Sequence, residues 1–393
     1  MLDEYTIKDV IDEVIDYRGK TPKKLGGDWS EVKTDCMALS AKNIKKGRIV
    51  QPDTIRYVDQ EMYNKWMKQE VERGTILITS EAPFGELLYW DSNDKIVLSQ
   101  RLFGLKIKKE FNSRYIYYYM FSEQFQGELS GRATGSTVTG LRQPELLKCH
   151  LKIPNRKYQD IIAAMLMNID KKIDLNNEIN NNLYDLGKSY FEDFISNCDR
   201  EVAIKDIADE VLDYTKNKND KVKLLNSSDV TENIFPKVEF VDNKDLKGHF
   251  KKRFKKHDIL YSQIRPRNHH YGYVLLDDSE NYLASTRFMV VRNKKEKVSS
   301  SLLYYYLTSK NAVEDFTTKT ELRSGTFPQG NYEDLSSYVV KYSSNQESIT
   351  KILDLILETI NNNNNENEKL SQLRDTLLPK LMNGEIDLDN IEI

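Results

Sequence analysis

Residues 357–370 read LETINNNNNENEKL, a run of asparagines between apolar residues that resembles low-complexity polar filler. This stretch has a partner in the same chain, because residues 346–381 align without a gap over residues 159–194. The aligned apolar positions are Ile162, Leu166, Ile169 and Ile173 in residues 159–194 and Ile349, Leu353, Ile356 and Ile360 in residues 346–381. Their four-three-four spacing is typical of the seam of a coiled coil.

The asparagines continue this seam. Asn176 and Asn180 keep the same spacing in the first copy, and Asn363 and Asn367 keep it in the second copy. Asparagine is a poor helix former in isolation, but a polar residue at a seam position fixes the register of a coiled coil at some cost in stability. We therefore predict that the asparagines lie inside a long helix, with a disordered polar tract as the alternative interpretation.

The segments before the two helices also repeat. IKDVIDEVIDY at 7–17 recurs as IKDIADEVLDY at 204–214, SQRLFGLKI at 99–107 as STRFMVVRN at 285–293, and YIYYYMFS at 115–122 as LLYYYLTS at 302–309. The offset between the copies shrinks after residue 17, which indicates an insertion near residues 18–35 of the first copy. Strand-like apolar runs between Gly and Asn turns, together with the tyrosine-rich helical segments, predict a mixed α/β head in each copy.

The repeats predict an α+β fold in which two similar mixed α/β heads are joined by two long antiparallel helices. The helices form a coiled coil, and the chain has a pseudo-twofold internal repeat. The predicted boundaries are 1–154 for the first head, 155–196 for the first helix, 197–343 for the second head, and 344–393 for the second helix with a C-terminal tail. Neither helix can bury its apolar stripe alone, so pairing of the two copies is the simplest arrangement.

The composition excludes several classes of protein. Lys and Arg number 58 and Asp and Glu number 61 in 393 residues, so the chain has no global positive field to attract nucleic acid. Cys36, Cys149 and Cys198 stand far apart without CxxC spacing, which argues against disulfides or a zinc module and suits a reducing compartment. The chain lacks a signal-peptide pattern and a run of about 18 apolar residues. We expect a cytoplasmic protein with no membrane segment.

If the protein binds DNA, its polar and basic residues must gather locally. Phosphate contacts favour Lys, Arg, Ser and Thr, and base edges favour Arg, Asn and Gln. The candidates in the first head are Arg18, Lys20, Lys23, Lys42, Asn43, Lys45, Arg132, Thr134, Ser136, Thr137 and Arg142. The candidates in the second head are Lys252, Arg253, Gln263, Arg265, Arg267, His269, Arg323, Ser324 and Thr326. A solvated surface charge or a turn residue is the alternative for each, although the recurrence of GST at 135–137 as SGT at 324–326 favours that loop.

Motifs for catalysis are missing from the sequence. GKT at 19–21 and GKS at 187–189 lack the earlier glycine of a phosphate-binding loop, since Val14 and Asn182 occupy those places. No NPPY-type tetrapeptide is present to hold a flipped adenine. His269 and the adjoining histidine have no cysteine or carboxylate partners at metal-ligand spacing. Residues 28–33 contain an acid-x-Lys pattern, DWSEVK, that a nuclease could use, but such a short pattern is common by chance.

The chain resembles the specificity subunit of type I restriction-modification enzymes over nearly its whole length. The resemblance rests on the two-copy layout, DYRGKTPKK at 16–24, the GST and SGT loops, and NEKLSQLRDTLLPKLMNGEIDL at 367–388. It implies that each head is a target-recognition domain, similar to that of some adenine-N6 methyltransferases, and reads one half of a bipartite double-stranded DNA target. It also implies that the helices set the spacing and dock two methyltransferase (M) subunits, and that restriction (R) subunits join for cleavage.

The same resemblance implies a non-catalytic subunit. S-adenosylmethionine, ATP and Mg are then expected on the partner subunits, with no cofactor or metal in this chain. The apolar candidates for the partner surface are Leu373, Leu377, Leu378 and Leu381, which the coiled-coil seam could equally use. Two alternatives stay open: a self-contained nuclease or ATP-driven enzyme, and a coiled-coil scaffold that binds two proteins through its heads.

Overall fold

The computed structural model describes residues 2–134, 140–244, 246, 248–294, 297–323 and 328–389. The chain forms two compact units, one of Met1–Lys172 with Leu370–Ile393 and the other of Ile173–Lys369. Each unit contains one head and a part of each long helix. Among the described residues, no helix combines the length and the apolar character needed to cross a membrane.

The first head is built on a four-stranded sheet of order β2-β10-β7-β8, formed by Ile11–Asp16, Leu102–Ile107, Ile76–Thr79 and Leu87–Tyr89. A second sheet has the order β6-β3-β9, from Arg56–Val58, Cys36–Leu39 and Ile96–Leu98. β1 (Asp3–Thr6) pairs with β11 (His150–Ile153), and β4 (Ile44–Lys45) pairs with β5 (Arg48–Ile49). The α-helices of this head are α1 (Ile7–Val10), α2 (Gln60–Trp66), α3 (Ser113–Tyr119), α4 (Glu123–Gly131) and α5 (Gln143–Leu146).

The second head repeats this plan. Its sheet of order β13-β20-β17-β18 is formed by Ala208–Glu210, Phe288–Asn293, Ile259–Ser262 and Tyr271–Tyr273. A second sheet has the order β15-β14-β19-β16, from Phe240–Asp242, Lys221–Leu225, Tyr282–Ser285 and Phe250–Lys252, and β12 (Arg200–Ala203) pairs with β21 (Val339–Tyr342). The α-helices are α7 (Ile204–Ile207), α8 (Ser300–Thr308), α9 (Lys310–Glu321) and α10 (Tyr332–Ser336). The matching strand orders confirm the internal repeat.

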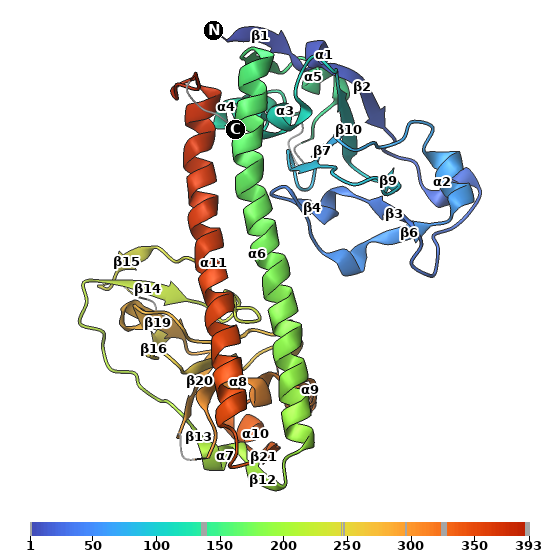
Figure 1. Ribbon diagram of the computed structural model, residues 1–393. Helices are drawn as coiled ribbons and strands as arrows, with labels where there is room; N and C mark the ends of the chain where they lie inside the picture. Colours follow the sequence, from blue (N-terminus) through green and yellow to red (C-terminus); the bar gives the residue numbers. More distant parts are fainter. Residues whose placement is uncertain are drawn as a thin grey trace. The chain divides into compact units, whose positions relative to one another are not determined.

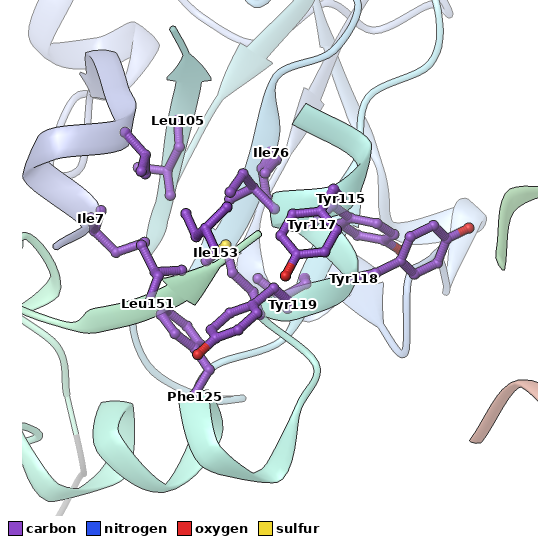
Figure 2. Close-up of a cluster of buried hydrophobic side chains, with 14 of the residues drawn as sticks. Ile7, Ile76, Leu105, Tyr115, Tyr117, Tyr118, Tyr119, Phe125, Leu151 and Ile153 are labelled. Atoms are coloured by element: carbon purple, nitrogen blue, oxygen red, sulfur yellow. The ribbon is translucent and has the colours of Figure 1, made fainter. Parts of the chain in front are cut away.

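The tyrosine-rich helix α3 lies in the core of the first head. Figure 2 shows its tyrosines in one cluster with Ile76 of β7, Leu105 of β10 and Leu151 of β11, and all of these side chains are buried. The hydroxyl of Tyr118 donates to Asp170 on the adjoining long helix at 2.6 Å. In the second head α8 has the same role, with its tyrosines packed in the corresponding core.

The two long helices are α6 (Arg156–Ser196) and α11 (Glu347–Met382), which Figure 1 shows as long coiled ribbons in green and red. Each helix is tied to its own head by the same contact. The Gln159 side-chain oxygen accepts from the backbone N–H of Asn112 at 2.9 Å, and that of Gln346, at the start of α11, accepts from Ser299 at 3.3 Å. The predicted helices are thus present, and each starts against the head that precedes it.

The asparagines pair across the two helices within the second unit. Asn176, 1% exposed, donates from Nδ2 to Asn367 Oδ1 at 2.9 Å and to Glu366 Oε2 at 2.7 Å. One turn along α6, Asn180 donates to Asn364 at 2.9 Å. Residue numbers rise on one helix as they fall on the other, so the helices run antiparallel. The alternative of a disordered polar tract is therefore wrong.

The apolar part of the predicted seam has a second role. Ile162 and Leu166 belong to the core of the first head, and Leu353 belongs to the core of the second. The helix-on-helix seam predicted from the spacing is therefore partly a helix-on-head interface. The spacing alone could not distinguish these cases, because both bury one apolar face of a helix.

The leucines near the end of α11 differ from the expected partner surface. Leu381 is only 3% exposed and lies in the core of the first head, and Leu377 and Leu378 pack against that core. Leu388, beyond the helix, is also buried there. Of the four candidate leucines only Leu373, 48% exposed, presents a large apolar surface. The expected partner surface is corrected to that extent.

Candidate nucleic-acid interface

Three predicted residues of the first head converge on one pocket of about 540 Å³. Arg18, Thr134 and Arg142 line it, although Arg18 lies far from the other two in the sequence. The backbone brings them together, because Ser80 N–H donates to the carbonyl of Arg101 at 2.8 Å and its own carbonyl accepts from Leu141 N–H at 2.9 Å. The end of strand β7 thus joins the loop after β9 to the segment that precedes α5.

A second hollow of about 280 Å³ adjoins the first, since Gln100 and Arg101 line both. It contains the predicted residues Lys42 and Asn43. We call the combined surface the first-head cleft; its lining residues are Arg18, Gly19, Trp29, Ala38, Ser40, Ala41, Lys42, Asn43, Thr54, Arg56, Ser80, Glu81, Ala82, Ser99, Gln100, Arg101, Thr134, Gly140, Leu141 and Arg142. A cleft lined by arginines, lysine, amides and hydroxyls has the side-chain types that contact phosphates and base edges.

Arg18 is held in place in this cleft. Its guanidinium donates to both carboxylate oxygens of Asp16 at 2.9 Å, lies 3.9 Å from the centroid of the Phe103 ring, and donates to the carbonyl of Leu141 at 3.3 Å. The carboxylate balances its charge. Arg18 is therefore better suited to fixing the loop, or to a directed hydrogen bond, than to attracting phosphate at a distance.

Some predicted residues of the first head have structural partners instead. Asn43 is buried and its side chain bonds to Ser40 and Thr54, so it shapes the turn. The Lys20 ammonium donates to the carbonyl of Trp66 at 3.4 Å. Arg132 donates to Glu128 at 2.9 Å and lies outside the residues that line the cleft. Burial of Asn43 argues against a direct contact with DNA.

The Glu128 carboxylate, in the last turn of α4, forms hydrogen bonds with two basic side chains, Arg132 and His150. Burial tends to raise its pKa, but hydrogen bonds from His150, at 2.7 Å, and from Arg132 outweigh burial and lower the pKa below its ordinary value. Glu128 therefore stays ionised at neutral pH. Its bond to Arg132 holds the end of α4, shortly before Thr134 of the cleft.

Four predicted cations of the first head remain exposed and form no ion pair within the described ranges. These are Lys23, Lys42, Lys45 and Arg142. Arg142 stands immediately before α5, at the edge of the cleft. Exposed cations without an ion pair are the groups most able to neutralise phosphates, and of these four Lys42 and Arg142 line the cleft.

Sequence reasoning missed Gln100 and Arg101. Arg101 has a φ of 68°, which projects an arginine from a tight turn, and its exposed side chain pairs with Glu81 at 2.9 Å. A signal was available, because the aligned segments SQRLFGLKI and STRFMVVRN both have arginine at the third place, Arg101 and Arg287. The repeat of a charged residue at a turn between two buried strands is informative, since packing does not require it there.

The second head has the same backbone framework. Gln263 N–H donates to the carbonyl of Arg287 at 2.9 Å, and the Gln263 carbonyl accepts from Gly330 N–H at 2.9 Å. In these backbone hydrogen bonds, Gln263 of the second head takes the place of Ser80 of the first, and Gly330 takes the place of Leu141. The predicted Gln263 and Arg265 lie on this framework, and Arg265 is exposed at a φ of 48°.

Most of the other predicted cations of the second head are matched by acids. Lys252 is 3% exposed and pairs with Glu210 at 2.9 Å, which argues against a phosphate contact. The further pairs are Arg267 with Glu321 at 3.2 Å, His269 with Glu232 at 2.9 Å and Arg323 with Asp334 at 2.8 Å, while Arg253 donates to Thr215 at 3.4 Å. Burial tends to raise the pKa of Asp334, but the bonds from Arg323 and from the Asn331 backbone lower it. DNA would have to compete with these acids for the cations.

Four predicted residues lie outside the described residues. They are Ser136 and Thr137 of the first head and Ser324 and Thr326 of the second. Their assignment to a DNA contact stays a prediction. The described residues Thr134 and Gly140 exchange backbone hydrogen bonds at 2.9 Å, and both line the cleft.

Comparison with known proteins agrees with this architecture. Residues 3–184 and 200–372 each match the family described as the type I restriction modification DNA specificity domain. The type I restriction enzyme HindI specificity subunit of Haemophilus influenzae is 38% identical over 159 residues, which are 40% of this chain and 34% of that protein. The MjaVIII specificity subunit of Methanocaldococcus jannaschii is 25% identical over 143 residues, 35% of this chain and 33% of that protein. The matched part thus spans about a third of the length of these curated relatives.

A solved structure shows the same fold over nearly the full length. The S subunit of a type I restriction-modification system from M. genitalium is 15% identical with a TM-score of 0.59, and the match covers 97% of this chain and 96% of that one. At this identity the likeness concerns the fold alone. Because the family match covers both heads and most of both long helices, this chain belongs to the type I restriction-modification DNA specificity family.

Proposed function

We propose that this chain is the DNA specificity subunit of a type I restriction-modification complex, and that each head contacts one half of a bipartite duplex target. The observation that carries the proposal is the shared framework of the two heads. The same backbone hydrogen bonds present Arg101 and Arg287 at equivalent places, while Gln100 is replaced by Thr286 and Arg142 by Asn331. An arginine at the same place suits a phosphate contact in both heads, for which Arg101 would exchange Glu81 for the phosphate. The differing side chains suit two unlike half-sites.

The mechanism that we propose is positional. The contacts of the two heads fix where the complex sits on the duplex, and the paired helices set the distance between the half-sites. Two methyltransferase subunits then act on adenines taken out of the base stack. S-adenosylmethionine would be bound by those subunits, and ATP and Mg by restriction subunits. In this proposal the chain itself is non-catalytic and works in the cytoplasm.

Salt-dependent duplex binding tests this proposal against the scaffold alternative. If the cations of the heads neutralise phosphates, the logarithm of the association constant falls linearly with the logarithm of salt concentration, at about 0.9 per phosphate contacted. We expect a measurable slope for the full chain, by fluorescence anisotropy on a labelled duplex. A scaffold that only binds proteins would show no such slope.

The nuclease alternative needs its own control. The acid-x-Lys pattern gives the variant Glu31→Gln, whose carboxylate lies on an exposed segment of the first head. If the chain were a nuclease, incubation of a duplex with Mg²⁺ would yield fragments that the variant does not produce. We expect intact duplex with both proteins.

A further inference from the structure

A third pocket lies in the first unit, away from the first-head cleft. It has a volume of about 400 Å³, and none of its lining residues belongs to that cleft. It lies between the region of β8 and α3 and the long helix α6. The lining residues are Arg73, Tyr89, Asp91, Phe111, Asn112, Ser113, Arg114, Arg156, Met167 and Lys171.

The pocket carries an excess of positive charge. Arg73 donates to one oxygen of Asp91 at 2.7 Å, and Arg114 donates to the other oxygen. Arg156 pairs with Asp160 at 2.8 Å. Lys171 is exposed, and no ion pair holds it within the part of the chain that the structure describes. Four cations therefore share two carboxylates, which leaves two positive charges around the cavity.

The cations are held in fixed positions before any ligand arrives. The Arg114 guanidinium lies 3.6 Å from the centroid of the Tyr89 ring, and the Tyr89 hydroxyl bonds to Ser113 Oγ at 2.9 Å. Arg156 also donates to the carbonyl of Lys109 at 2.8 Å. A guanidinium fixed by stacking and by one carboxylate keeps further N–H donors and loses little side-chain entropy when it binds an anion.

At the corresponding place in the second head, the long helix carries carboxylates where the first head has Met167 and Lys171. Tyr273 occupies the position of Tyr89 in the repeat, and the aligned helix residues are Asp354 in place of Met167 and Glu358 in place of Lys171. Burial, followed by the charges of Asp354 and Glu358, raises the pKa of Tyr273, so these carboxylates lie close to it. Among the described residues, the charge of Lys171 is thus reversed at the aligned position of the second half.

We propose that the pocket lined by Arg73, Arg114, Arg156 and Lys171 binds a phosphate group. Two excess positive charges match a phosphate dianion, and the planar donors of arginine match its oxygens in pairs. Asn112 and Ser113 add neutral hydrogen-bonding groups at the same wall. The phosphate could belong to a small molecule or to a nucleic-acid backbone, which present the same oxygens. This inference does not depend on the proposed function of the heads.

Calorimetry on the full chain with pyrophosphate, and separately with a short duplex, tests the proposal. The informative variant is Lys171→Glu, which installs the residue found in the second half. Its matched control is Lys188→Glu, an exposed lysine on the same helix about 25 Å further along. We expect pyrophosphate binding that Lys171→Glu weakens roughly tenfold or more and Lys188→Glu leaves unchanged.

Each outcome has a clear meaning. Binding of pyrophosphate that depends on Lys171 supports a small-molecule phosphate site. If only the duplex binds in a Lys171-dependent way, the phosphate comes from the nucleic-acid backbone, and the pocket is a second contact with DNA outside the cleft. Absence of both, or binding that Lys171→Glu and Lys188→Glu affect equally, would overturn the proposal. A circular dichroism melt checks that both variants are folded.

Discussion

For individual residues, ion pairing separates the cations available to DNA from those that hold the fold. Arg142 is exposed at the edge of the cleft and forms no ion pair within the described ranges, whereas Arg132, ten positions earlier, is bound to Glu128. Lys252 is buried against Glu210. Equal charges in the sequence thus differ in what they can do, because a paired cation must first give up its carboxylate.

Arg142→Ala should weaken duplex binding roughly tenfold, the cost of one charge-assisted contact. If the contact is with a phosphate, the loss is similar for all sequences and the salt slope falls by about one. The matched variant Arg132→Ala should leave the affinity nearly unchanged. Anisotropy titrations at several salt concentrations measure both. If Arg142→Ala and Arg132→Ala weakened duplex binding equally, the exposed, unpaired state of Arg142 would not explain its contribution, and this prediction would be wrong.

Glu128 should make the stability of the first head depend on pH. Its pKa in the folded protein is lowered, whereas in the unfolded chain it is about 4.3. The stabilisation is therefore fully present above that value and is lost as the pH falls through the lower folded pKa. Glu128→Gln should reduce stability at neutral pH and flatten the loss in acid, as measured by urea unfolding between pH 7 and pH 3. Parallel curves for variant and wild type would refute this role.

The sequence predicted Arg18, Thr134 and Arg142 as neighbours of a ligand from residue type and loop position alone, and the structure brings them together. It could not reveal that Lys252 is neutralised, because Glu210 lies on a different strand. It also missed Arg101, whose placement depends on a turn between two strands and on the approach of the end of β7. The repeated arginine of the aligned segments marked Arg101 and Arg287 as special, but their place beside a cleft depends on tertiary contacts that leave no local pattern.

For the secondary-structure elements, the long helices followed from the sequence because the heptad spacing persists through the asparagines. What the spacing did not show is that the apolar seam near each helix start packs on a head, since a head and a helix offer similar apolar surfaces. The asparagine layers are the part of the seam that is specific to helix pairing, because their hydrogen bonds need one register.

The layer of Asn176 and Asn367 should fix that register. Asn176→Leu alone should lower the free energy of unfolding by about 1–3 kcal/mol, because the half-buried partners Glu366 and Asn367 lose a hydrogen bond to a buried side chain. Asn176→Leu with Asn367→Leu should recover much of that loss, since an apolar layer is stable but less selective in register. Urea unfolding measures the energies. A double variant that is as unstable as the sum of the single variants would contradict this explanation.

Two helical glycines form a matched pair. A Cβ on Gly187 of α6 would lie 2.1 Å from the hydroxyl of the buried Tyr305, whereas a Cβ on Gly127 of α4 would meet nothing within 4 Å. Gly187→Ala should therefore destabilise the second unit by about 1–3 kcal/mol through overpacking. Gly127→Ala should stabilise the first by up to about 1 kcal/mol through helix propensity. Opposite shifts in melting temperature are expected, and shifts of the same sign would contradict the close contact.

At the scale of the whole molecule, the C-terminal segment of the chain belongs to the same compact unit as the N-terminal head. The first compact unit contains both ends of the chain, since the C-terminal segment after residue 370 packs on the N-terminal head. Leu388 is buried in that core, and Asp389 accepts from the Tyr158 hydroxyl at 2.5 Å. Each compact unit therefore contains one head and a part of both long helices. The repeat in the sequence predicted two heads, but the contribution of the C-terminal segment to the first core required the structure.

The central claim is that two unlike heads read two halves of one DNA target, and methylation mapping tests it most directly. The chain would be co-expressed with a candidate methyltransferase subunit, and N6-methyladenine would be located across the host genome by single-molecule sequencing. We predict one gapped motif, methylated on both strands, in which a variant with Gln100→Ala and Arg142→Ala changes one half only. If the complex forms and no new methylation appears, or if both halves change together, the two-headed account is contradicted.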